Sequence, residues 1–109
     1  MKAMISMPMG GKTKEEIDAV FERAKTALEG MGYIVLDTRF HLSEDMMDLF
    51  GVRNRPLRYL GESLNDMSKC GAVYFVEGWN TARGCRIEHH AAKEYGLKVL
   101  YEEEGESEE

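Results

Sequence analysis

AVYFVEGWNTARGCRIE, at residues 72–88, decides the fold, because it joins an apolar run, a glycine-containing loop and the start of a helix. The run at 72–76 is rich in β-branched and aromatic residues, which predicts a buried strand. Loop 77–84 follows, and the next residues place three apolar side chains on one face of a helix that ends at Gly96: Ile87, Ala91 and Tyr95. A strand that leads through a short loop into a helix is half of a βαβ unit, so this stretch indicates an α/β fold.

The rest of the chain repeats this alternation. Further strands are predicted at residues 3–7, 33–36 and 98–101. Helices are predicted between them, at about 14–31, as a short turn over 43–50, and from Pro56 through Met67. This pattern predicts a parallel sheet of strand order 2-1-3-4 with helices on both faces, a small flavodoxin-like or Rossmann-like domain over residues 1–101.

The first helix carries the clearest end signals. Thr13 and Glu16 have the spacing of a capping box, and Gly32 follows the last apolar position of the helical stripe. Ser43 is expected to cap the short turn, and Gly51 to end it.

The composition is that of an ordinary globular domain, with 43% hydrophobic and 31% charged residues. The net charge of −6 comes from the segment after Tyr101, which holds six glutamates and no lysine or arginine. Segment 102–109 is therefore predicted to be a disordered acidic tail, and the electrically balanced body is not expected to bind duplex nucleic acid. Neither a membrane-spanning run nor a signal peptide is visible, so a cytoplasmic location and two free cysteines are expected.

The topology predicts where a ligand binds. In the order 2-1-3-4 the winding of the sheet reverses between the first and third strands, and open α/β sheets bind ligands at that crevice. Loops 8–13 and 77–84 meet there, and each leads into a helix N-terminus, which attracts anions.

Several side chains of these loops suit a nucleotide, although each also has an ordinary structural explanation. Arg83 and Arg86 are suited to bidentate phosphate contacts, or are simply solvated. Trp79 is suited to stacking on a base or ribose, or to closing the end of the core. Ser6 and Lys12 are further phosphate candidates, with a structural role favoured for each.

Cys85 and His89 stand one helical turn apart, and His90 follows. A metal site is not predicted from them, because no second pair of ligands is visible, and Cys85 as a nucleophile is set aside as well. No cofactor is predicted.

Two stretches, KAMISMPMGG at residues 2–11 and GWNTARGCRIEH at 78–89, resemble the two signatures of the DUF4406 family of small phage and bacterial proteins. That family is similar to the nucleoside 2-deoxyribosyltransferases and the deoxynucleotide N-glycosidases. The resemblance implies that Glu88 is a nucleophile that attacks the sugar carbon, kept ionised by the nearby helix N-terminus. It also implies a homodimer or larger assembly, and substrate contacts from Ser6, Pro8, Met9, Gly10, Ser63, Gly78, Trp79, Thr81, Arg83, Gly84 and Arg86.

Three positions depart from those enzymes. Met4 stands where they have a tyrosine, Ser63 where they have an aspartate, and Ala82 where they often have a serine. The leading hypothesis is an enzyme of the N-glycosidic bond of a nucleoside or nucleotide, with Glu88 as nucleophile. The alternative is a non-catalytic nucleotide-binding module, which the three departures favour. A purely structural phage or host protein is the third hypothesis.

Overall fold

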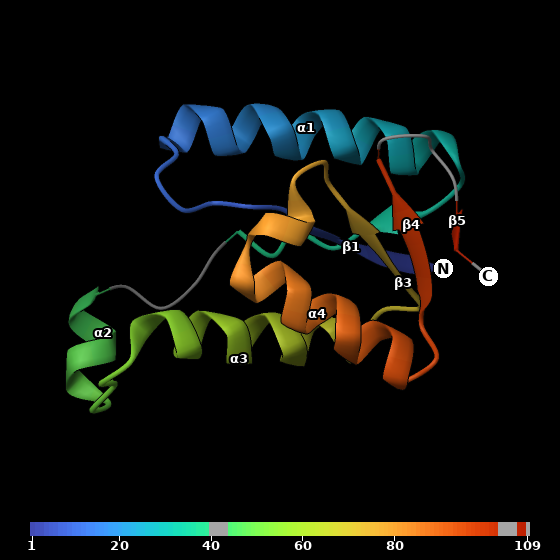
Figure 1. Ribbon diagram of the computed structural model, residues 1–109. Helices are drawn as coiled ribbons and strands as arrows, with labels where there is room; N and C mark the ends of the chain where they lie inside the picture. The colour runs from blue at the N-terminus through green and yellow to red at the C-terminus, as the bar shows by residue number, and fades with distance from the viewer. Residues whose placement is uncertain (40–43, 103–106, 109) are drawn as a thin grey trace.

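A parallel sheet forms the centre of the protein, seen in a computed structural model that describes residues 1–39, 44–102 and 107–108 (Figure 1). Its strand order is β2-β1-β3-β4-β5. The first four of these strands pair in parallel, which confirms the predicted order 2-1-3-4. The strands are β1 (Lys2–Ser6), β2 (Ile34–Val35), β3 (Ala72–Phe75), β4 (Lys98–Tyr101) and β5 (Ser107–Glu108).

Helices cover both faces of the sheet, as predicted (Figure 1). Of the described helices, α1 (Lys14–Gly30) lies on one face. Helices α3 (Arg55–Met67) and α4 (Arg83–Glu94) lie side by side on the other. A short helix α2 (Glu44–Leu49) precedes α3, and a single 3-10 turn η1 (Trp79–Thr81) precedes α4.

The capping box predicted at the start of α1 is present. Thr13 Oγ1 accepts the N–H of Glu16 at 3.1 Å, and Glu16 Oε1 accepts the N–H of Thr13 at 2.9 Å. At the other end the chain turns at Gly32, whose φ of 93° is a left-handed conformation that glycine adopts readily. The sequence signals therefore place both ends of α1 correctly.

Two apolar layers form the core, because successive strand residues point to opposite faces. On the α1 face, Ile5 and Tyr74 pack with Phe21 and Leu28. On the other face, the layer is formed by Met4, Val73, Phe75, Val99, Met67 and Ala92. All of β3 is buried because helices cover both of its faces. Ser6 belongs to the second layer by alternation, so it is a polar side chain directed toward α3 and α4.

The face that α4 buries differs from the apolar stripe in the sequence. Tyr95 is 85% exposed and Ile87 42% exposed, whereas Cys85, Glu88 and Ala92 are buried. The prediction that Ile87, Ala91 and Tyr95 form the apolar face therefore does not identify the buried one. The physical reason lies in remote parts of the chain: Ser6 donates a hydrogen bond to Glu88 and Ser63 also lowers its pKa, so this face of α4 carries a carboxylate into the interior.

Part of the segment predicted as a disordered tail is placed in the structure. Ser107 and Glu108 pair antiparallel with Leu100 and Val99 of β4, and Glu102 is hydrogen-bonded to Arg23. The other tail residues, 103–106 and 109, lie outside the described residues, as does Ser43, the predicted cap of α2. Helix α3 begins at Arg55, one residue before the predicted Pro56, because the Asn54 side chain accepts the N–H of Leu57. Within the described ranges, no helix combines the length and the apolar character needed to cross a membrane.

The capping box predicts a measurable stability difference between two threonines of the same segment. Thr13→Ala removes the cap and is expected to lower the free energy of unfolding by about 1 kcal/mol. Thr26→Ala is the matched control, because the exposed Thr26 hydroxyl only donates to the Glu22 carbonyl within α1; its effect is expected to stay within about 0.5 kcal/mol. Urea unfolding followed by circular dichroism measures both, and an effect of Thr13→Ala no larger than that of Thr26→Ala would show that the capping box contributes nothing to stability.

Candidate functional site

The two loops predicted to meet at the crevice between β1 and β3 do meet. The N–H of Val76 donates to the Ser6 carbonyl at 3.0 Å as the strands end. Beyond this bond, Pro8 Cγ lies 3.6 Å from the position that a Cβ would take on Gly78. Gly78 has a φ of 91°, so the turn that brings the loops together requires a left-handed residue.

Glu88 lies beside this crevice, in the second turn of α4, with 8% of its surface exposed. The Ser6 hydroxyl at the end of β1 donates a hydrogen bond to Glu88 Oε1 at 2.6 Å. The Ser63 side chain on α3 also acts on the Glu88 carboxylate and lowers its pKa. Three elements that are distant in the sequence therefore converge on one carboxylate.

No lysine, arginine or histidine of the described residues forms an ion pair with Glu88. Burial raises the pKa of Glu88 above its ordinary value, and the hydrogen bonds from Ser6 and Ser63 only partly oppose this rise. Desolvation is the largest contribution to this rise, and it opposes the ionised form that the helix N-terminus is expected to favour. The carboxylate is thus held by neutral donors in a poorly hydrated place.

Cys85 lies one turn before Glu88 on the same face of α4 and is 5% exposed. Burial raises the pKa of its thiol to about 11, partly opposed by a hydrogen bond with Ser6. The thiol is therefore neutral at physiological pH, which argues against a nucleophilic role. Where the chain is described, no three histidine, cysteine, aspartate or glutamate side chains are grouped as a metal site would need.

An aromatic cluster lies on the other side of α4, above the end of the sheet. The Trp79 ring stacks on His89 with centroids 4.1 Å apart, and His89 Nε2 lies 2.6 Å from the Tyr101 hydroxyl. Phe75 contacts both Trp79 and Tyr101, at centroid distances of 5.4 and 6.2 Å. One face of Trp79 is therefore used in packing against the core.

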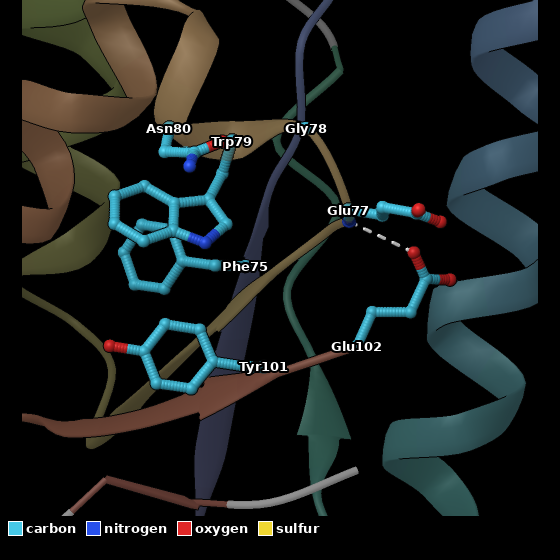
Figure 2. A pocket seen from close by; sticks show the side chains of 7 residues that line it. All are labelled: Phe75, Glu77, Gly78, Trp79, Asn80, Tyr101 and Glu102. Atoms are coloured by element: carbon cyan, nitrogen blue, oxygen red, sulfur yellow. Dashed lines mark hydrogen bonds between the residues drawn. The ribbon is translucent and has the colours of Figure 1, made fainter. Parts of the chain in front are cut away.

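A hollow of about 200 Å³ opens next to this cluster, at the ends of β3 and β4. Figure 2 shows the aromatic side chains on one side of it and the carboxylates of Glu77 and Glu102 on the other. Its lining residues are Phe75, Glu77, Gly78, Trp79, Asn80, Tyr101 and Glu102. Neither Glu88 nor Ser6 lines it, because Glu88 points from α4 toward β1 and α3, whereas the hollow lies beside β4.

The other predicted contact residues lie around the loops and are more exposed than Glu88. Arg83 and Arg86 are exposed at the start of α4, and Arg86 donates to the Asn80 carbonyl at 3.4 Å. The Thr81 hydroxyl donates to the Gly78 carbonyl at 2.7 Å, which stabilises the turn. Met9, Gly10 and Lys12 are exposed on the first loop, and Pro8 and Gly84 are half-buried. Met4 is buried in the core with 1% of its surface exposed.

Two features of this region were not predicted from the sequence. Ser63, a predicted substrate contact, lies near enough to Glu88 to lower the pKa of its carboxyl group. Glu102 was assigned to the tail, although it lines the hollow together with residues of loop 77–84. No local signal distinguishes Glu102 from the glutamates that follow it, because its partner Arg23 is remote in the sequence.

The family model described as "Domain of unknown function (DUF4406)" matches residues 1–101. Comparisons with curated proteins and with solved structures give no significant match.

The burial of Glu88 predicts that Glu88→Gln stabilises the protein more at neutral pH than at acid pH. A raised pKa means that the folded state binds a proton more readily than the unfolded state, so the stability of the natural protein falls as pH rises from the ordinary glutamate pKa to the raised one. Glu88→Gln has no carboxyl group at this position, so its stability does not fall in this way as the pH rises. Its stability advantage is expected to grow across that window by at most about 1.4 kcal/mol per pH unit, the slope for one proton.

Urea unfolding at pH 4 and pH 7 measures this difference. Glu94→Gln is the matched control, because Glu94 is an exposed glutamate on the same helix. Its effect is expected to stay within about 0.5 kcal/mol at both pH values. An advantage of Glu88→Gln that is equal at pH 4 and pH 7 would contradict the prediction.

Proposed function

Since the chain belongs to the DUF4406 family, we propose that it cleaves or transfers the N-glycosidic bond of a nucleoside or nucleotide, with Glu88 as nucleophile, as the resemblance noted from the sequence implies. One observation carries the proposal. Glu88 is buried near the carboxyl ends of the strands, and none of the described cationic side chains pairs with it.

Such a carboxylate destabilises the folded protein, because its desolvation is only partly offset by two hydroxyl groups. Perturbed carboxylates of this kind are concentrated at functional sites. Glycosyl transfer supplies the missing positive charge, because the sugar develops oxocarbenium character in the transition state. A carboxylate that pairs with none of the described cationic side chains is therefore complementary to the transition state more than to the neutral substrate.

In the proposed reaction an oxygen of the Glu88 carboxylate attacks C1′ of the sugar. The C1′–N bond breaks, and its electron pair leaves with the base, which takes up a proton. The resulting glycosyl ester is released by water or by a second base, which restores the carboxylate. Ser6 holds Oε1, and both serines favour the ionised form of Glu88.

The second candidate function, a nucleotide-binding module without catalysis, is supported by the departures from the enzyme pattern. Met4 is packed in the core, and Ser63 is a hydroxyl where the enzymes carry a carboxylate. A second carboxylate able to protonate the leaving base is therefore missing at that position. Under this alternative, Glu88 accepts a hydrogen bond from a sugar hydroxyl.

Glu88→Gln separates the two functions. For an enzyme, the variant is expected to bind nucleotide but to lose turnover by a factor above about a thousand, because the amide is nearly isosteric and not nucleophilic. Chromatography of the base released from nucleosides and nucleoside monophosphates measures turnover, and thermal shift measures binding. For a binding module, no base is released and affinity falls by roughly 1–3 kcal/mol. Unchanged binding and no turnover in either protein would remove Glu88 from the site altogether.

Ser6→Ala tests whether Ser6 supports the ionised nucleophile. The Ser6 hydrogen bond lowers the pKa of Glu88, so its loss is expected to raise that pKa further. Because the nucleophile must be ionised, the acidic limb of kcat/KM is expected to move to higher pH in this variant. Thr81→Ser is the control, since it keeps the hydroxyl that bonds to Gly78. A fall in kcat/KM with an unmoved acidic limb would show that Ser6 acts on packing alone.

A further inference from the structure

Glu102 directly follows β4 and is the first residue of the acidic segment. It is nevertheless hydrogen-bonded to three residues of the folded body: Arg23, Glu77 and Phe75. Its carboxylate accepts two hydrogen bonds from Arg23 on α1, from Nε to Oε2 at 2.6 Å and from Nη2 to Oε1 at 3.1 Å. Oε1 also accepts the backbone N–H of Glu77 at 3.0 Å, as Figure 2 shows. The N–H of Glu102 donates to the Phe75 carbonyl at 2.9 Å. One residue therefore connects α1 with the ends of β3 and β4.

Glu77 is the point from which loop 77–84 leaves the sheet. The next residue, Gly78, makes the left-handed turn against Pro8, and Trp79 then stacks on His89. The N–H of Glu77 lies past the end of β3, beyond the ladder that pairs β3 with β4. A side-chain acceptor at this point fixes the peptide plane just before the glycine turn.

We infer that Glu102 is a positioning residue for loop 77–84. Arg23 holds the Glu102 carboxylate with two hydrogen bonds, and that carboxylate holds the N–H of Glu77. The loop then leaves the sheet along a fixed path toward Trp79 and the N-terminus of α4. This inference depends on the proposed function only in taking the loop as part of the site.

The arrangement differs from an ordinary surface ion pair. The Glu102 side chain is 16% exposed, and burial by itself would raise its pKa. The bonds from Arg23 and from the N–H of Glu77 outweigh burial and lower the pKa of Glu102. By contrast, Lys25 Nζ and Glu29 Oε2 on the same helix are 4.0 Å apart, and both side chains are more exposed than that of Glu102. Exposed ion pairs of this kind contribute little to stability.

Trp79 is the only tryptophan of the chain, so its fluorescence reports on the loop directly. The experiment compares Glu102→Ala, Glu102→Gln and Arg23→Gln with the control Glu29→Gln. It reads acrylamide quenching of Trp79 and hydrogen exchange of the Glu77 amide by NMR. In Glu102→Ala the amide is expected to exchange roughly tenfold faster or more, as loss of a charge-assisted hydrogen bond implies, and Trp79 to become more accessible. Glu29→Gln is expected to change neither quantity.

The conservative variant distinguishes positioning from packing. Glu102→Gln keeps a carbonyl oxygen that is able to accept the Glu77 N–H, so it is expected to restore most of the amide protection lost in Glu102→Ala. The double variant of Arg23→Gln and Glu102→Ala is expected to exchange no faster than Glu102→Ala alone, because both changes interrupt one chain of contacts.

Unchanged Glu77 protection in a folded Glu102→Ala protein would overturn the inference, as would additive effects in the double variant. Circular dichroism establishes whether each variant folds. If Glu102→Ala does not fold, Arg23→Gln tests the inference instead. Protection of the Glu77 amide in Arg23→Gln equal to that in Glu29→Gln would then refute the inference. Turnover is not measured, so the result stands whether or not Glu88 is a nucleophile.

Discussion

The covering of both faces of a parallel sheet is the constraint from which the site follows. Every side chain of β3 and all but the first of β1 are buried, so the strands are apolar except where a polar group finds a partner inside. Ser6 is such a group, and its partner is Glu88 on α4, 2.6 Å away. Because parallel strands end at one edge, the same constraint brings the loops after β1 and β3 together at Pro8 and Gly78.

The apolar patterns and the helix-end signals in the sequence were sufficient to predict the fold. The apolar run at 72–76, the capping box of Thr13 and the alternation of elements lead to the observed order of parallel strands, because each depends on neighbours in the chain. The meeting of loops 8–13 and 77–84 followed from topology in the same way. These features needed no knowledge of which side chains touch.

The contacts of the site were less accessible from sequence, because they join residues far apart in the chain. Ile87 and Tyr95 gave α4 an apolar stripe, yet the helix buries the face with Glu88, since Ser6 and Ser63 satisfy its carboxylate. Hydropathy counts a glutamate as a surface residue and takes no account of two hydroxyls 82 and 25 positions away. Glu102 was missed for the same reason, because nothing near it marks Arg23 as its partner.

The two ends of the sheet have a consequence for how the protein behaves at high concentration. Strands β2 and β5 are only two residues long each, and they flank the longer strands β1, β3 and β4. An outer strand recruits another molecule through its row of unsatisfied amide and carbonyl groups, and a row this short gives a second chain little to pair with. The Val99–Leu100 stretch of β4 is apolar, so an unpaired edge there would favour association with another chain. This edge is instead paired with the Ser107–Glu108 segment. The architecture thus opposes open-ended polymerisation into fibres at these two edges.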